Sequence, residues 1–272
     1  MKKSIAVIKV GGDVLLNEEE RFGLAKNIRD LKDADWDIVI LHGGGTQVDR
    51  LQKQHGLQSR KVGGRRITSL EDLLVIKQAI CGEVNINLVQ LLQNEHLNAF
   101  GCSGNSGKLI VAKQRPPQIV SGAGNEAIDF GEVGDVTEIN VALINTFLAA
   151  KLIPVIATLG VEANSGRVFN INADTTVVQL AKALSADLTL LTTSVGGVYK
   201  EIGNEASRIK VIDKTIADEL IATKVIQGGM IPKIEEALSV SGKVAIVGPQ
   251  ATGTFLSIAE GNTDFGTTIL SN

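Results

Sequence analysis

Residues 38–50 read Ile-Val-Ile-Leu-His-Gly-Gly-Gly-Thr-Gln-Val-Asp-Arg, an apolar run that ends at three consecutive glycines. The apolar run predicts a buried strand, and the pattern after the glycines predicts a helix. Three glycines, Gly43 to Gly45, allow positive φ angles and let a ligand approach the backbone closely. The first N–H groups of a helix have no partner within it and carry partial positive charge. We therefore interpret this stretch as a binding site for a phosphate or carboxylate group.

Length and composition narrow the class of protein. A chain of 272 residues with 44% hydrophobic residues can form one large α/β domain or two coupled lobes. A net charge of −3 gives no general reason to bind nucleic acid or an anionic membrane. The longest apolar region, 141–161, is interrupted by polar residues and a proline, so we do not expect a membrane span. The two cysteines, Cys81 and Cys102, show no metal-ligand spacing, which fits a reducing cytoplasm.

Predicted strands and helices alternate along the chain, and each strand is a continuous apolar run. Strands are expected at residues 4–10, 38–42, 153–157, 188–191, 244–247 and 267–270. Helices are expected at 18–34, 69–80, 84–93, 140–150, 174–184, 216–222 and 233–240. The polar, glycine-rich region 101–136 favours short hairpins or a flap. This pattern predicts an α/β fold with a largely parallel central sheet sandwiched between helices.

Four familiar sites can be tested against the glycine-rich segments. A strand before His-Gly-Gly-Gly suggests an esterase oxyanion loop, but the chain has no Gly-x-Ser-x-Gly. Residues 104–108 resemble a phosphate loop with the wrong glycine spacing. Residues 122–127 match a relaxed dinucleotide fingerprint, yet two prolines precede them and no amphipathic helix follows. The three histidines are scattered without zinc-like pairing, so we expect them to be structural or exposed.

Several polar residues remain that could act together at the carboxyl ends of parallel strands. Lys9 follows the first predicted strand and precedes Gly11 and Gly12. The segment 170–174 carries Asn170, Asn172 and Asp174, of which Asp174 can cap the following helix. Each of these motifs alone has an ordinary structural explanation, such as a glycine turn, an exposed lysine or a helix cap. Their occurrence together, in this order, is much more specific for a functional site.

Taken together, these motifs resemble the amino acid kinase family over essentially the whole chain. Within that family, the combination looks most like the branch that acts on acetylglutamate, rather than the aspartate, carbamate or uridylate kinases. The residues that carry the resemblance are Ile8-Lys-Val-Gly-Gly12, Val39-Ile-Leu-His-Gly-Gly-Gly45, Gly64-Arg-Arg-Ile-Thr68, Asn170-Ile-Asn-Ala-Asp174 and Gly228-Gly-Met-Ile-Pro-Lys233.

The resemblance implies transfer of the ATP γ-phosphoryl group to the side-chain carboxylate of N-acetyl-L-glutamate, a step of arginine synthesis. Such a carboxylate has an unperturbed pKa of about 4.3, so it is ionised at neutral pH and needs no general base. The resemblance also implies two coupled lobes: 1–160 for the acyl substrate and dimerisation, and 161–272 for ATP. Mg²⁺ is expected on the ATP phosphates, although we find no convincing carboxylate ligand for it. A cytoplasmic homodimer is expected, without arginine feedback, because the N-terminal helix of arginine-inhibited members is not found before Lys9.

The resemblance assigns roles to individual residues. Lys9 and Lys233 are the implied catalytic lysines, and we interpret Asp174 as the ion-pair partner that holds both. The implied substrate-binding residues are Gly44, Gly45, Arg66 and Asn170. The implied nucleotide-binding residues are Gly11, Gly12, Ser194, Gly197, Val225, Ile226 and Gln227. Two serines, Ser106 and Ser194, stand where relatives commonly have aspartate, and Arg65 stands where many have an apolar residue.

Two alternatives stay open. A kinase for a related acceptor, such as an N-acyl-aminoadipate, differs from the first reading by one methylene group. A catalytically silent binding or regulatory homologue is the second. The joint presence of Lys9, Asp174 and Lys233 disfavours the silent homologue, because a binding module needs no phosphoryl clamp.

Overall fold

A computed structural model describes residues 3–119, 126–201, 203–226 and 230–271. Its central sheet has eight strands in the order β14 (Val211–Ile212), β16 (Thr267–Ile269), β15 (Lys243–Val247), β13 (Leu188–Thr192), β1 (Ile5–Val10), β2 (Asp37–His42), β10 (Ile153–Ala157) and β5 (Ala99–Ser103). Neighbouring strands are parallel except for β15 and β16, which are antiparallel. The predicted, largely parallel sheet is therefore confirmed.

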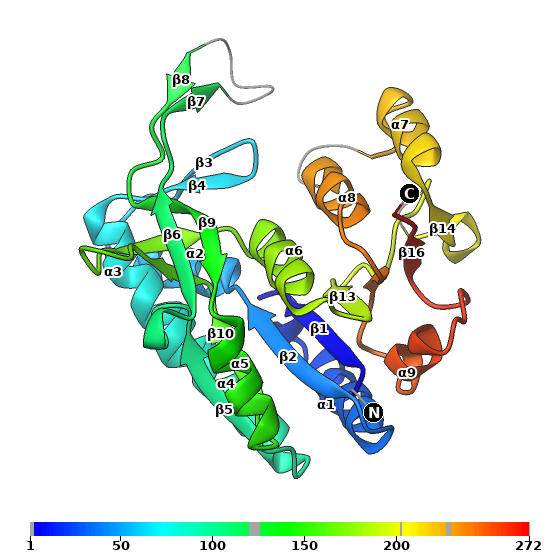
Figure 1. Cartoon of the computed structure of the whole chain (residues 1–272). Helices are drawn as coiled ribbons and strands as arrows, with labels where there is room; N and C mark the ends of the chain where they lie inside the picture. The colour runs from blue at the N-terminus through cyan, green and yellow to red at the C-terminus, as the bar shows by residue number, and fades with distance from the viewer. Residues whose placement is uncertain (1–2, 120–125, 202, 227–229, 272) are drawn as a thin grey trace.

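Helices cover both faces of this sheet (Figure 1). On one face lie α1 (Glu18–Asp33), α4 (Asn85–Asn94) and α9 (Thr254–Ala259), and on the other α5 (Val141–Ala149), α6 (Ala173–Leu184), α7 (Lys214–Ala222) and α8 (Met230–Leu238). Successive side chains of β1 alternate between these two hydrophobic cores, since Ile5 and Val7 contact one and Ala6 and Ile8 the other. This alternation explains why each strand is apolar throughout.

A third, smaller core lies beneath α2 (Gly45–Gln54) and α3 (Leu70–Lys77), where Val48 packs with Ile76 and Ile80. Ser69 and Asp72 form the capping box at the start of α3 that the sequence predicts. The sequence predicts two separate helices here, at 69–80 and 84–93. Instead a π-helix, Gln78–Val84, joins α3 directly to α4. Such segments are uncommon and often lie beside functional sites.

Shorter elements surround the upper part of the sheet. Four strands close into a small barrel: β6 (Ile110–Gln114), β9 (Val133–Ile139), β11 (Leu159–Val161) and β12 (Val168–Ile171). The hairpins are β3 (Arg60–Val62) with β4 (Arg65–Ile67), and β7 (Gln118–Ile119) with β8 (Ala127–Ile128). Short 3₁₀ turns lie at Val14–Leu16, Ser106–Lys108 and Glu205–Ser207. The β7–β8 hairpin projects from the body of the molecule in Figure 1, which agrees with the hairpins expected for 101–136.

The carboxyl ends of β1, β2 and β13 lie side by side near the middle of the sheet. Lys9 of β1 pairs with Leu41 of β2 on one side and with Leu191 of β13 on the other. The sheet therefore continues across residue 160, where we divide the chain into lobes. Of the helices that the structure describes, none combines the length and apolar character needed to cross a membrane.

Candidate active site

Three charged residues that are distant in the sequence meet at one point. The Lys233 Nζ of α8 donates a hydrogen bond to Asp174 Oδ1 of α6 at 2.8 Å. The Lys9 Nζ of β1 lies 3.2 Å from the same oxygen. Both lysine side chains are nearly buried, with exposed fractions of 12% for Lys9 and 13% for Lys233. The ion pairing expected from the sequence is therefore present.

Asp174 does not cap α6, so that part of the sequence analysis is wrong. The N-cap is Asn172, whose Oδ1 accepts a hydrogen bond from the Thr175 N–H at 3.0 Å. The helix begins directly after Asn172, which places Asp174 inside its first turn. The Asp174 carboxylate thus does not serve as the helix cap and instead contacts the two lysines.

The charges of this cluster are strongly coupled. Burial alone would raise the pKa of Asp174, but the positive charges of Lys9 and Lys233 outweigh it and lower that pKa to about 2. Burial lowers the pKa of Lys233, and repulsion by Lys9 lowers it further, whereas Asp174 opposes both effects. One carboxylate therefore lies between two ammonium groups. The positive charge left over suits an additional anion such as a phosphoryl group.

The three-glycine turn has a different geometry from the one expected. None of Gly43 to Gly45 adopts a left-handed φ, and Gly44, the N-cap of α2, is extended with a φ of 164°. Close packing explains the need for glycine instead. A Cβ on Gly44 would lie 3.0 Å from the Val84 Cγ2 atom, and a Cβ on Gly12 would lie 2.9 Å from the Gly44 Cα atom. The two glycine turns thus touch each other backbone to backbone.

Two side chains hold the Lys9 turn in place, and the sequence analysis did not single out either. The buried Gln47 donates from Nε2 to the Gly12 carbonyl at 2.9 Å. Thr192 donates from Oγ1 to the Lys9 carbonyl at 3.0 Å and accepts from the Gly11 N–H at 3.4 Å. The sequence does contain a hint of the role of Gln47. It is a polar residue in the first turn of the predicted helix, directly after the glycines, where a buried side chain can bond to the neighbouring turn.

His42 supports the glycine turn from behind. Its ring is fully buried, with Nε2 lying 2.8 Å from Asn85 Nδ2 and Nδ1 lying 2.9 Å from the Gly43 carbonyl oxygen. These partners assign the proton to Nδ1, which donates to the carbonyl, while Nε2 accepts from the amide. Burial lowers the pKa of His42 to about 4, although the Gly43 carbonyl acts in the opposite direction. The structural role expected for this histidine is therefore observed.

A cavity of about 230 Å³ opens beside the glycine turn. It is lined by Gly43 to Gly45, Arg66, Asn170 and Asn172, among others. Asn170 donates from Nδ2 to Thr68 Oγ1 at 3.1 Å, which fixes its amide. The structure thus brings the predicted substrate-binding residues to one cavity, which we call the acceptor cavity.

Arg66 enters this cavity with most of its donors already engaged. Its Nη1 donates to Gln52 and Ser59, and its Nη2 to Asp49 at 2.7 Å and to the Gly45 carbonyl at 3.4 Å. Because a guanidinium group has five N–H donors, only the Nε–H is left over. A bidentate grip on a substrate carboxylate, as expected from the sequence, thus requires one of these partners to give way.

The predicted nucleotide-binding residues of the C-terminal half lie on two separate segments. In the loop after β13, the Ser194 hydroxyl contacts Glu20 Oε2 at 2.7 Å and Asp13 Oδ2 at 3.1 Å, and Gly197 packs close to Thr267. After α7, Ile226 is buried in the core and Val225 packs against the same core. Gln227, together with Gly228 and Gly229 of the motif, lies outside the described residues.

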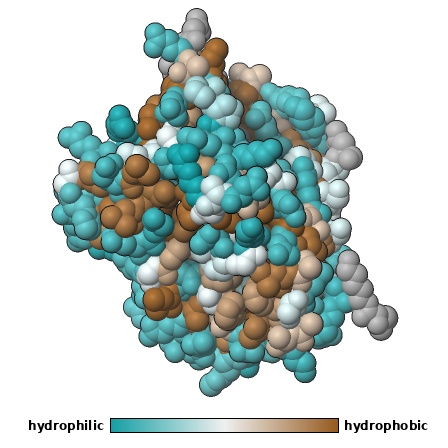
Figure 2. All heavy atoms as spheres, turned by 60° about the vertical axis from the view of Figure 1, so that its left-hand side comes forward, coloured by the Kyte–Doolittle hydropathy of each residue, from teal (hydrophilic) through white to brown (hydrophobic). Residues whose placement is uncertain are grey.

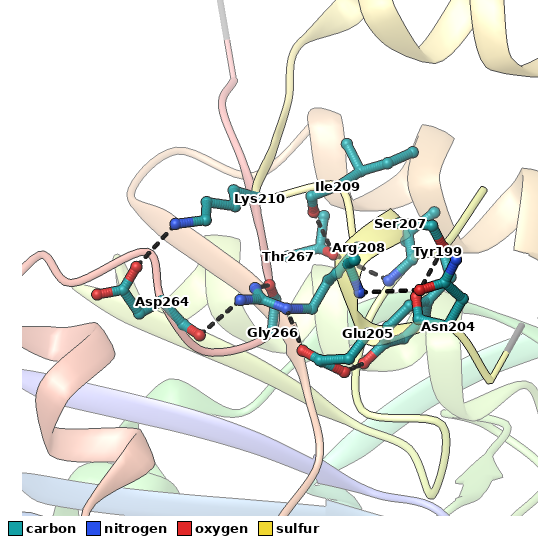
Figure 3. A network of polar contacts seen from close by, with 12 residues as sticks. Tyr199, Asn204, Glu205, Ser207, Arg208, Ile209, Lys210, Asp264, Gly266 and Thr267 are labelled. Carbon is teal, nitrogen blue, oxygen red and sulfur yellow. Dashed lines mark hydrogen bonds and ion pairs between the residues drawn. The ribbon is translucent and has the colours of Figure 1, made fainter. Parts of the chain in front are cut away.

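A polar network holds the chain that follows the β13 loop (Figure 3). Arg208 donates to the carbonyls of Asp264, at 2.6 Å, and Gly266, and its Nε reaches Glu205 Oε1 at 2.8 Å. Lys210 forms a salt bridge of 2.8 Å with Asp264. The Arg208 side chain is only 9% exposed, so this network fastens residues 205–210 to the residues directly before β16.

Comparison with known proteins gives a consistent answer. A model of the amino acid kinase family matches residues 4–246. An acetylglutamate kinase from Anaeromyxobacter sp. (strain Fw109-5) is 40% identical over 91% of this chain and 92% of its own length. The crystal structure of smu.665 from Streptococcus mutans UA159 superposes with a TM-score of 0.79 at 30% identity, covering 98% of this chain and 99% of that one. N-acetylglutamate synthase from Neisseria gonorrhoeae shares the fold, with a TM-score of 0.80 at 22% identity over 100% of this chain and 60% of that one.

The burial of His42 predicts a pH dependence of stability. Because its pKa in the folded state, about 4, lies below the ordinary 6.5, the unfolded chain binds the proton more readily. This contribution is fully present above pH 6.5 and is lost as the pH falls through about 4, by at most about 3 kcal/mol. We expect His42→Gln to lose less stability than the parent between pH 7 and pH 5, measured by urea unfolding. The exposed His55, changed to Gln, is the control; an equal pH dependence for parent and His42→Gln would contradict the assignment.

Proposed function

This chain belongs to the amino acid kinase family, and on that premise we propose that it transfers the γ-phosphoryl group of ATP to the side-chain carboxylate of N-acetyl-L-glutamate. The product is an acyl phosphate used in arginine biosynthesis. The observation that supports this proposal most directly is the Asp174 carboxylate shared by Lys9 and Lys233 close to the acceptor cavity. Relatives named acetylglutamate kinase that align over most of the chain support the choice of acceptor.

The chemistry requires positioning and charge stabilisation rather than proton transfer. The acceptor carboxylate is already ionised, so one of its oxygens attacks the γ-phosphorus while the bond to the β-phosphate oxygen breaks and ADP leaves. Lys9 and Lys233 approach the transferring group from β1 and α8 and stabilise its negative charge. Asp174 keeps both ammonium groups in position. A carboxyl group with a pKa of about 2 is too weak a base to accept a proton near neutral pH, so we do not assign it as a general base.

The acceptor cavity is proposed to hold N-acetyl-L-glutamate. Arg66 and Asn170 are assigned to its α-carboxylate end, and the N–H groups of Gly44 and Gly45 to the reacting end. The cavity of about 230 Å³ and its basic lining support an acceptor of this size and charge. A longer N-acyl-aminoadipate is the related acceptor that the experiment below distinguishes.

The C-terminal lobe, 161–272, is proposed to bind ATP, with 1–160 holding the acceptor. Gly11 and Gly12 contribute backbone to the phosphates, and Ser194, Gly197, Val225, Ile226 and Gln227 flank the nucleoside. Because the Ser194 hydroxyl contacts Asp13 and Glu20, we assign its contribution to the backbone of the loop. Among the described residues no three acidic, histidine or cysteine side chains gather as a metal site, and Asp174 is committed to two lysines. These residues do not form a cage for Mg²⁺, which we propose enters with the ATP phosphates.

A homodimer formed through the N-terminal lobe is proposed as the working assembly. The edge strand β5 carries Phe100, which is 41% exposed and stacks near Phe147 with ring centroids 5.1 Å apart. Leu70, Leu74 and Ile86 on α3 and α4 are each more than half exposed. Figure 2 shows hydrophobic side chains gathered in patches on the corresponding side of the molecule.

A cytoplasmic location is also proposed. Cys81 and Cys102 are free thiols, and thiols stay reduced in the cytoplasm, where ATP is available.

The proposed reaction can be tested by trapping the acyl phosphate with hydroxylamine. The purified protein is incubated with ATP and with N-acetylglutamate, N-acetylaspartate, N-acetylaminoadipate or glutamate. We expect the hydroxamate mainly from N-acetylglutamate, and a rate about 10²- to 10³-fold lower for Lys9→Ala and Lys233→Ala. Preference for N-acetylaminoadipate would support the alternative acceptor. No product from any acceptor would favour a silent homologue.

The role of Asp174 predicts the behaviour of Asp174→Asn. Since Asn172 caps α6, the substitution leaves the cap intact but leaves two nearly buried ammonium groups without their counter-ion, so we expect a lower thermal stability and a loss in kcat of about 10²-fold. Without the carboxylate the pKa of Lys233 falls further, so the alkaline limb of kcat/KM should move to lower pH. Full activity with an unchanged pH profile would refute the ion-pair role.

The proposed dimer can be measured by gel filtration with light scattering. We expect a mass twice the 28.7 kDa of one chain, and dissociation by Phe100→Glu, which places a charge on the edge strand. The exposed Leu270, which follows β16 at the other end of the sheet, provides the control Leu270→Glu. A monomeric or hexameric parent protein would contradict the dimer.

A further inference from the structure

The acceptor cavity contains more positive charge than one α-carboxylate needs. Four basic side chains line it, Lys61, Arg65, Arg66 and Arg115, and its lining includes no acidic side chain. Three of the four form salt bridges with two carboxylates outside the cavity. Lys61 and Arg66 share Asp49 at 2.6 and 2.7 Å, and Arg115 pairs with Asp135.

Arg65 is the exception. Within the part of the chain that the structure describes, its guanidinium group takes part in no salt bridge and no hydrogen bond. The side chain is nevertheless partly buried, so its charge is not simply dispersed into solvent. A partly buried cation without a direct hydrogen bond or salt bridge to the described residues has donors left to offer, and an anion that binds there would satisfy them.

The backbone fixes where Arg65 lies. It is the first residue of β4, and its partner across the hairpin is Val62. The two residues between them, Gly63 and Gly64, have φ angles of 54° and 75°, as a tight two-residue hairpin requires. The position of Arg65 is therefore set by the pairing of a short hairpin.

Arg65 also lines a second, smaller cavity of about 70 Å³, together with Asn172, Asp174, Thr175 and Glu236. It thus stands between the acceptor cavity and the carboxylate that holds the two lysines. Glu236 lies three residues beyond Lys233 on α8. Burial raises the pKa of Glu236, whereas the charges of Lys182 and Arg65 lower it, so Arg65 is within electrostatic reach of α8.

We propose that Arg65 is a third anion-binding cation of this site and that it contacts an oxyanion other than the α-carboxylate assigned to Arg66. This inference rests on the proposed function. Its position beside Asp174 assigns the oxyanion to the transferring phosphoryl group, whose charge Arg65 shares with Lys9 and Lys233. A planar guanidinium group with all of its side-chain donors available is well suited to phosphoryl oxygens. The other source of the same chemistry is a carboxylate at the end of the acceptor's acyl group.

The test compares Arg65→Leu, Arg65→Lys and the parent protein in steady-state kinetics with ATP. Two acceptors are used, N-acetylglutamate, whose acyl group is neutral, and N-succinylglutamate, whose acyl group ends in a carboxylate. We expect Arg65→Leu to lower kcat with N-acetylglutamate by about tenfold or more with little change in its KM, and Arg65→Lys to retain part of the activity. The matched control is Arg60→Leu, which removes an exposed arginine from the neighbouring strand β3.

The outcomes separate cleanly. A loss confined to N-succinylglutamate, seen as a raised KM, supports the anion site and assigns its ligand to the acyl group. Kinetics of folded Arg65→Leu within about threefold of the parent for ATP and for both acceptors would overturn the proposal. If Arg65→Leu does not fold, Arg65→Lys and Arg65→Gln replace it, and kinetics of both within about threefold of the parent would likewise overturn the proposal. Calorimetric titration with ATP separates failure of the proposed function from failure of the Arg65 proposal. A parent protein that binds ATP but forms no acyl phosphate contradicts the proposed function. Equal ATP affinity of the parent and Arg65→Leu in that case would contradict the role of Arg65 as well.

Discussion

The contact on which the site depends is the single oxygen of Asp174 that faces both Lys9 and Lys233. Two ammonium groups with little exposure to water repel each other. One carboxylate placed between them offsets this repulsion and holds them close together. Because each member comes from a different element, β1, α6 and α8, the cluster forms only when two helices of one face are in place over the first strand.

The backbone around this cluster is organised by contacts that leave no room for side chains. Gly12 and Gly44 touch, while Gln47 and Thr192 bind the Lys9 turn from opposite sides. Behind the turn, the neutral ring of His42 joins Gly43 to Asn85, the residue that follows the π-helix. The irregular helix therefore has a physical reason here, since it brings Val84 and Asn85 against the glycine turn.

Much of this arrangement could be predicted from the sequence, because apolar runs buried on both faces leave a strong pattern. The same pattern placed Lys9 and the glycines at the carboxyl ends of strands, and the motifs located Asp174 and Lys233. The choice between Asn172 and Asp174 as the cap of α6 was not readable, since both residue types cap well and only the path of β12 decides. The sequence also did not reveal the π-helix or the use of Arg66 donors by Asp49 and Ser59. Nor did it reveal that Arg65 makes no hydrogen bond or salt bridge with the described residues. Each of these depends on contacts between residues far apart in the chain.

The strand order has a consequence for how the molecule forms. β1 leaves the ribosome well before β13, yet it lies in the interior of the sheet between β2 and β13, and β13 begins only at Leu188. Until then β1 has one bare edge, and pairing across so long a stretch of chain is slow because of its high contact order. A nascent chain that stops before α8 contains Lys9 and Asp174 without the second lysine. The cluster of Lys9, Asp174 and Lys233 is thus completed only after α8 has been made, and its formation reports that α8 has docked beside α6 and β1.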